Sequence, residues 1–343
     1  MKKAIAAILS IFLLSMTACA SDPTPASSEK TVSEQVSSVE SKEESEESPV
    51  ASSSEESSDV SSEEANVKVE HNYEKLTSLE GLKIVNFGDS IFGGFRQESG
   101  DRRSISSMLA EKTGATCINT AISGMTLAYN WFYQDYFSMH SMARYIKSGD
   151  FSPMETAFQK KASDNKTIEE VLQTLKQIDW STVDVITVAY GTNDYGSVAV
   201  PITGNEESYK SKYFTQAHAN KDQPDACTES TFDLAIRYTI SAIHEAYPQI
   251  RIVMITPVHR FDMTADVKND LGYTLSDYVE RMKSISEEMG VACLDLYNEC
   301  DIQEATEDKY FGTDKVHPNL QGREAMADYI AAHLLDALNS YAE

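Results

Sequence analysis

Short apolar runs alternate with helical patterns between residues 82 and 341 of this 343-residue chain. The runs are rich in β-branched residues, whereas the segments between them repeat apolar residues at helical spacing. The predicted strands are 82–87, 115–123, 183–190, 251–257 and 291–297, and the predicted helices are 102–114, 167–178, 231–247, 275–290 and 320–341. Such alternation predicts a three-layer α/β/α fold, in which helices cover both faces of a five-stranded parallel sheet.

Candidate chemistry lies in the loops that follow the apolar runs, because parallel sheets bind ligands beyond the carboxyl ends of their strands. The loops in question contain "GDS" (88–90), Gly124, "GTND" (191–194) and, well after the last run, "DKVH" (314–317). Taken singly, each residue has an ordinary structural explanation. Ser90 can cap a helix, Gly124 can serve a tight turn and Asn193 can close a loop.

The spacing of Asp314 and His317 allows a catalytic explanation, which the rest of the chain has to decide. In a loop marked by Gly312 and Pro318, the Asp314 carboxylate can reach one ring nitrogen of His317 while the other nitrogen faces outward. A histidine base and its orienting carboxylate are arranged in this way in nucleophilic catalysis. The alternative is a surface turn that leads into the last helix, with Pro318 and Asn319 at its start.

The four blocks, in this order and each on the expected element, resemble the signature blocks of the SGNH (GDSL-type) hydrolases. The resemblance covers most of residues 80 to 340 and implies a flavodoxin-like SGNH hydrolase fold. Ile91 departs from the family pattern, which has leucine after the serine, but this difference changes nothing chemical.

The resemblance also assigns roles to individual residues. It implies that Ser90 is the nucleophile, that His317 accepts its proton, and that Asp314 fixes the histidine tautomer. It implies further that the backbone N–H groups of Ser90 and Gly124 and the side-chain amide of Asn193 form an oxyanion hole.

Four other side chains lie near these blocks. Asp89 and Asp194 are expected to shape loops as hydrogen-bond acceptors rather than to act as catalysts. Trp131, in the aromatic-rich stretch 126–149, and His259, at a strand end, are candidate substrate contacts; packing within the domain is the alternative. No cluster of histidine, cysteine and carboxylate has metal-ligand spacing and no phosphate-binding loop is present, so neither metal nor cofactor is predicted.

Residues 1–19 have the form of an export signal, with two lysines followed by the apolar stretch 4–14. The end of this segment, "MTAC", resembles a bacterial lipobox. The resemblance implies cleavage before Cys19 and lipidation of its thiol, which would anchor the protein to the extracellular face of a bacterial cell membrane. An ordinary secretory signal with a chance cysteine is the alternative.

The stretch 20–70 has 14 acidic residues, 3 basic residues and no aromatic residue. Such a composition cannot bury enough apolar surface to offset the entropy lost on ordering, so we predict a disordered Ser/Glu-rich linker over 20–75 and a hydrolase domain over 76–343. Residues 72–343 carry a formal net charge of −16, that is, −25 for the whole chain less −9 for residues 1–70, and such an acidic surface argues against binding of nucleic acid or another anionic polymer, which requires basic surface.

Four cysteines follow Cys19, and we expect them to be free thiols or to form at most one disulfide. They are Cys117, Cys227, Cys293 and Cys300, of which Cys117 and Cys293 fall within predicted strands. A polar stretch, 195–227, is predicted to form a lid or a rim over the site.

The combined pattern predicts a serine esterase that removes small acyl groups, such as acetyl, from carbohydrate. One alternative is a lipid-directed hydrolase of lysophospholipase or thioesterase type. Another is a non-catalytic lipoprotein that binds carbohydrate in the same cleft, although a silent protein need not keep Ser90, Asn193 and His317 together.

Overall fold

The computed structural model describes residues 71, 73–94, 103–128, 136–163, 165–196, 200–203 and 231–341. Within them, one parallel sheet has the strand order β2-β1-β3-β4-β5. The strands are β1 (Lys83–Gly88), β2 (Thr116–Asn119), β3 (Val185–Ala189), β4 (Arg251–Ile255) and β5 (Ala292–Leu294). The predicted α/β fold with a five-stranded parallel sheet is confirmed. The strand order reverses between β1 and β3, and parallel sheets bind their ligands at such a reversal.

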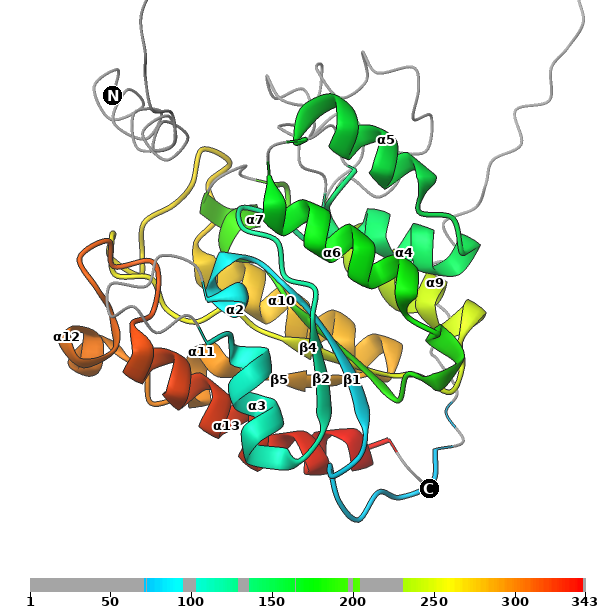
Figure 1. Ribbon diagram of the computed structural model, residues 1–343. Helices are drawn as coiled ribbons and strands as arrows, with labels where there is room; N and C mark the ends of the chain where they lie inside the picture. Colours follow the sequence, from blue (N-terminus) through cyan, green and yellow to red (C-terminus); the bar gives the residue numbers. More distant parts are fainter. Residues whose placement is uncertain are drawn as a thin grey trace, which may run out of the picture. The chain divides into compact units, whose positions relative to one another are not determined.

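Helices cover both faces of the sheet (Figure 1). One face carries α4 (Met139–Ser148), α5 (Ser152–Lys161), α6 (Lys166–Gln177), α9 (Phe232–Ala246) and α10 (Leu275–Met289). The opposite face carries α3 (Ile105–Thr113) and α13 (Leu320–Asn339). Shorter helices are α2 (Ser90–Gly93), α7 (Thr192–Gly196), α11 (Leu296–Glu299) and α12 (Glu307–Tyr310), with 3₁₀ turns at Trp180–Thr182 and Glu304–Thr306.

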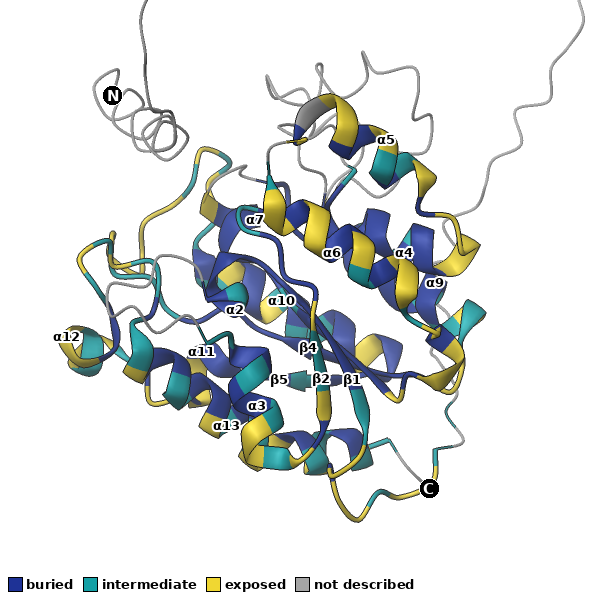
Figure 2. Ribbon diagram, viewed as in Figure 1, coloured by how far each residue is buried: buried dark blue, intermediate teal, exposed yellow. Residues whose placement is uncertain are grey.

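The central strands β1, β3 and β4 are buried on both sides over most of their length, as Figure 2 shows for the centre of the sheet, whereas the edge strand β2 is exposed or half-buried. Successive residues point to opposite faces, so Val85 packs under α4 and α9 while Ile84 packs against α3 and α13. Two apolar clusters result, one on each face of the sheet. This two-sided burial explains why the strands read as continuous apolar runs rather than as an alternating pattern.

The observed elements differ from the predicted ones mainly at their ends. The predicted strand 291–297 is too long, because the Asp295 side chain accepts the Asn298 N–H at 3.0 Å and begins α11. The predicted helix 102–114 begins only at Ile105, since the Ser104 hydroxyl accepts the Ser107 N–H at 3.2 Å. Helix α5 was not predicted at all.

The chain enters the domain at the amino ends of the strands. The Tyr73 hydroxyl donates to the Ile250 carbonyl, just before β4, at 2.8 Å, and His71 Nε2 lies 2.7 Å from the Gly290 carbonyl. Leu76 and Asn339 exchange two hydrogen bonds of 2.8 and 2.9 Å. Residues assigned to the linker therefore already contact the domain from His71 onward.

The predicted signal segment, with Cys19, and most of the linker lie outside the described residues. No helix in the described part of the chain combines the length and the apolar character needed to cross a bilayer. Cys117, Cys293 and Cys300 are free thiols, while Cys227 lies outside the described residues. Burial raises the pKa of Cys117 to about 11 and that of Cys293 to about 12, so both thiols are protonated at neutral pH.

Candidate active site

Ser90 stands at the sharp turn where β1 passes into α2. The Asp89 carboxylate caps this helix by accepting the Ile91 N–H at 2.9 Å. A Cβ atom at Gly88 would lie 2.6 Å from the Cβ atom of Phe92, so only glycine allows the helix to fold back this closely. The glycine and the aspartate of "GDS" thus fix the turn that holds the serine.

A chain of two hydrogen bonds joins Ser90, His317 and Asp314. His317 Nδ1 donates to Asp314 Oδ2 at 2.8 Å, and the Ser90 hydroxyl donates to His317 Nε2 at 2.8 Å. Ser90 and His317 are 227 residues apart in the sequence. The structure therefore brings together the three side chains that the sequence nominated as catalytic.

Asp314 is fixed by the backbone of its own loop. Its Oδ1 accepts the N–H groups of Val316 and His317 at 3.0 and 2.9 Å, a tight turn that puts Lys315 at φ 56°. Burial opposes ionisation of this carboxyl, but the hydrogen bonds from the His317 ring and from both amides outweigh it and hold the pKa of Asp314 well below its usual range. A permanent negative charge therefore faces His317 Nδ1.

Gly124 and Asn193 lie beside this serine turn. The Asn193 amide donates to the carbonyl of Met125, the residue after Gly124, at 2.9 Å, and lies 3.4 Å from Asp89 Oδ2. Gly124 adopts φ 77°, a conformation that favours glycine. The three residues expected to donate to an oxyanion thus come from neighbouring loops at one place, at the carboxyl ends of β1, β2 and β3.

The loop after β4 braces the site, and none of the sequence motifs predicts this contact. The Phe261 N–H donates to the Lys315 carbonyl at 2.8 Å, which ties this loop to the one that carries His317. Arg260 reaches the Thr192 carbonyl at 3.4 Å and lies so close to Gly196 that a Cβ atom there would clash with the guanidinium. The last glycine of "GTNDYG" was the available sign of this close approach.

The two candidate substrate contacts have different outcomes. The His259 ring stacks on the Tyr297 ring with centroids 3.8 Å apart and lies 6.0 Å from that of Phe261. Burial lowers the pKa of His259, and hydrogen bonding at Tyr297 and Gln303 opposes this shift in part. Packing therefore accounts for its surroundings. Trp131 lies outside the described residues.

No group of three or more histidine, cysteine, aspartate or glutamate side chains in the described part of the chain is placed to hold a metal ion. A serine hydroxyl hydrogen-bonded to a histidine, which is hydrogen-bonded in turn to an ionised carboxylate, can perform nucleophilic acyl transfer. A small cavity of about 20 Å³ lies beside this turn, lined among others by Asp89, Tyr190 and Thr192.

Comparison with solved structures supports the fold. A protein from Lactobacillus plantarum is 20% identical over 74% of this chain and 97% of its own, with a TM-score of 0.50. A second crystal structure is 24% identical over 76% of this chain and 98% of its own, with a TM-score of 0.53. A carbohydrate acetylesterase from Sinorhizobium meliloti is 13% identical over 74% of this chain and 99% of its own; its TM-score of 0.42 is too low to bear on the substrate.

Comparison of sequences identifies the family. No curated protein matches the chain. The family model of the GDSL-like lipases and acylhydrolases matches residues 87–325, a span that includes Ser90, Gly124, Asn193 and His317. Because this match covers well over half of the chain, the protein belongs to the GDSL-like lipase/acylhydrolase family and is a hydrolase.

Proposed function

We propose that the enzyme hydrolyses carboxylic esters with Ser90 as nucleophile, His317 as general base and Asp314 as the orienting carboxylate. The hydrogen-bond chain through these three side chains, with both distances at 2.8 Å, is the observation that supports this function. His317 Nε2 takes the hydroxyl proton as Ser90 Oγ attacks the ester carbonyl, and then passes it to the departing alcohol. Water, activated by the same nitrogen, hydrolyses the acyl-enzyme.

The carbonyl oxygen becomes negatively charged as the tetrahedral intermediate forms, so it needs donors that are already in place. We assign this role to the backbone N–H groups of Ser90 and Gly124 and to the Asn193 amide. The hydrogen bond from Asn193 to the carbonyl of Met125 supports the assignment, since it holds the side chain beside Gly124.

We propose small acyl groups, such as acetyl, on carbohydrate as the substrate. The net charge of −25 is one support, because an acidic protein is repelled by anionic lipid surfaces but not by neutral polysaccharide. The lipid-directed alternative has no comparable observation in its favour.

A lipid anchor at Cys19 and a place on the outer surface of the cell membrane belong to the same proposal. The point of entry of the chain supports it indirectly: Tyr73 packs at the amino end of β4, whereas Ser90 stands at the carboxyl end of β1. A domain held by its N-terminal segment can therefore turn its active site away from the membrane and toward a polymer.

The proposal is tested by hydrolysis of p-nitrophenyl esters of increasing acyl length and of an acetylated polysaccharide. We expect acetate to be the preferred ester, release of acetate from the polymer, and loss of both activities in Ser90→Ala. An optimum at long acyl chains would favour the lipid-directed alternative. Unchanged rates in Ser90→Ala would exclude the serine mechanism.

A further inference from the structure

Asp194 follows Asn193 directly in α7, and its side chain is completely buried. Both of its carboxylate oxygens accept a backbone N–H. Oδ1 accepts that of Ala128 and Oδ2 that of Leu127, each at 3.0 Å. A single side chain thus holds two successive amides of the loop that begins at Gly124.

Other hydrogen bonds also hold the backbone of this loop. The Asn193 amide donates to the Met125 carbonyl at 2.9 Å, and the first turn of α4 donates to the carbonyls of Thr126 and Leu127 at 3.1 and 3.2 Å. Among these contacts, the two hydrogen bonds to Asp194 are the ones in which the loop is joined to α7 through a carboxylate. Hydrogen bonds to a charged acceptor are stronger than those between neutral groups.

We propose that Asp194 is a positioning residue for ester hydrolysis: it fixes the loop after Gly124 so that the Gly124 N–H and the Asn193 amide converge on one oxyanion. This inference rests on the proposed function, because it presupposes the oxyanion assignment. Asp194 itself touches no reacting atom. It acts through Leu127 and Ala128, whose amides it binds.

The chemistry of the carboxylate explains why a neutral residue would not serve equally well. An asparagine has the same shape but offers one acceptor oxygen, and its NH₂ group would face one of the two amides as a second donor. Burial raises the pKa of Asp194 to about 6, and the charge of Asp89 adds to this effect, although the hydrogen bonds from Ala128 and Leu127 oppose it. An ionisable group is thus kept where its ionisation is disfavoured, as is common at functional sites.

The expected consequence of disturbing this loop is kinetic. Oxyanion donors act when they lie about 2.7–3.1 Å from the developing charge, and a misplacement of about 1 Å can cost roughly 10²-fold in rate. We therefore expect Asp194→Asn to lower kcat roughly 10- to 100-fold while KM for a small ester changes less than about threefold.

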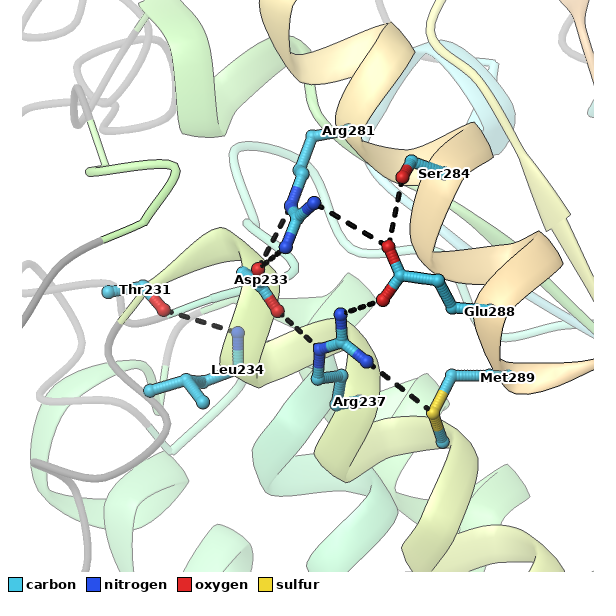
Figure 3. A network of polar contacts seen from close by, with 8 residues as sticks. All are labelled: Thr231, Asp233, Leu234, Arg237, Arg281, Ser284, Glu288 and Met289. Carbon is cyan, nitrogen blue, oxygen red and sulfur yellow. Dashed lines mark hydrogen bonds and ion pairs between the residues drawn. The ribbon is translucent and has the colours of Figure 1, made fainter. Parts of the chain in front are cut away.

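Asp233 provides a matched control, since it is also a buried aspartate but belongs to an ion-pair network between α9 and α10 (Figure 3). Wild type, Asp194→Asn and Asp233→Asn are compared with p-nitrophenyl acetate, and kcat is corrected for the folded fraction. The affinity for a trifluoromethyl ketone, which forms a tetrahedral adduct with the serine, is measured in parallel. Asp194→Asn should lose kcat and ketone affinity by similar factors, whereas Asp233→Asn should lower the melting temperature alone.

If folded Asp194→Asn has the same kcat and the same ketone affinity as wild type, the proposal is overturned, whatever the melting temperature of the variant. If Asp194→Asn does not fold, Asp194→Glu, which keeps the charge but moves both oxygens, is judged by the same two measurements. Failure of both variants to fold would make Asp194 a folding residue and would also overturn it. If the Ser90→Ala variant keeps the wild-type activity, the proposed function itself is wrong, whatever the result for Asp194.

Discussion

Two groups of charged side chains in the described part of the molecule balance their charges in opposite ways. Between α9 and α10, two arginines and two acidic residues pair with one another (Figure 3). Beside Ser90, the carboxyl groups of Asp89 and Asp194 are buried, and they accept hydrogen bonds from backbone N–H groups and from the Asn193 amide. In the first region, each charge lies beside an opposite charge. In the second region, the carboxyl groups accept hydrogen bonds mainly from the backbone of loops.

The ion-pair network favours the charged forms of Arg237 and Glu288, since it raises the pKa of the first and lowers the pKa of the second. Arg237 donates to Asp233 at 2.6 Å and also to Glu288, while Arg281 donates to the other oxygen of Asp233 at 2.9 Å. Burial opposes the charge of Arg237, but the hydrogen bonds to Glu288 and Asp233 outweigh it and raise the pKa of the guanidinium above its ordinary value. The network therefore holds α9 and α10 together.

The two carboxyl groups near the serine show the reverse balance. Burial raises the pKa of Asp89 to about 6, although the Ile91 N–H and the charge of His317 oppose the shift, and it raises that of Asp194 to about 6 as well. Each carboxyl nevertheless holds a backbone turn, Asp89 at the serine and Asp194 at the loop after Gly124. Charged and ionisable side chains in this protein thus stabilise helix packing in one place and loop geometry in the other.

The largest effect is expected from Asn193→Ala, which removes a proposed oxyanion donor. Loss of such a donor lowers kcat roughly 10²- to 10³-fold, or about 2.7–4 kcal/mol, because the interaction is made only in the transition state. KM should change little, and the free energy of unfolding should fall by only about 1 kcal/mol for the lost bond to Met125. Kinetics and thermal melting check this. A variant that melts much earlier but keeps its kcat when folded would make Asn193 a loop residue.

Arg237→Ala should produce the opposite result, a loss of stability without a loss of turnover. The side chain is only 8% exposed, and its removal leaves Asp233, 12% exposed, with fewer partners. Breaking a buried pair in this way costs roughly 3 kcal/mol. Urea unfolding should show this decrease, while kcat of the folded variant stays at the wild-type value. A change in kcat would mean that the two regions are coupled.

The ionisation of Asp89 and Asp194, near the serine, should also affect how the free energy of unfolding depends on pH. Their pKa is about 6 in the folded protein against an ordinary 3.8, so between pH 4 and pH 6 the unfolded chain releases protons that the folded protein retains. The free energy of unfolding therefore falls as the pH rises through this window. We expect wild type to lose roughly 2 kcal/mol more than Asp194→Asn between these pH values, since each pKa unit corresponds to about 1.4 kcal/mol.

Urea unfolding at several pH values measures this difference in slope, independently of any constant offset between the two proteins. Asp314 contributes with the opposite sign, because its lowered pKa gives stability that is lost only as the pH falls below its ordinary range. Parallel slopes for wild type and variant between pH 4 and pH 6 would contradict the prediction for Asp194.

The smallest effect is expected from Lys147→Ala, which sharpens the contrast with Arg237. Lys147 and Glu245 also join two helices, α4 and α9, at 2.5 Å, but their side chains are 39% and 66% exposed. Solvent-exposed ion pairs contribute only about 0–1 kcal/mol, since solvent screens them. A melting temperature within one degree of wild type is the expected result. If Lys147→Ala loses as much stability as Arg237→Ala, burial does not explain the difference between the exposed and the buried ion pair.

The fold could be predicted from the sequence because the apolar runs and the helical periodicity reflect burial, which is local information. The ends of elements could not, since they depend on single caps such as Asp295, which stops the fifth strand after Leu294. His71 and Tyr73 gave no sign of packing either, because they follow a long acidic stretch and find their partners in residues 250 and 290.

The candidate site divides in the same way. Ser90, Asp314 and His317 could be predicted from short motifs, because Ser90 comes just after the first strand, and Asp314 and His317 share one loop before the last helix. The partners of Asp194 and the contact of Arg260 with Gly196 could not, because they join loops that are distant in the sequence and whose conformations no periodicity records. Residue type revealed the reacting groups, whereas only the tertiary structure revealed what holds them.

The paired hydrogen bonds between Leu76 and Asn339 have a consequence for engineering. They bring the first and last segments of the domain together, and the rings of His71 and Tyr341 lie 6.2 Å apart. A domain whose two ends adjoin can be inserted into a surface loop of a host protein through short connectors, or circularly permuted by joining the old ends. Either splice would fall at the amino ends of the strands, so a fused or permuted enzyme would keep its reactive serine on the unobstructed side.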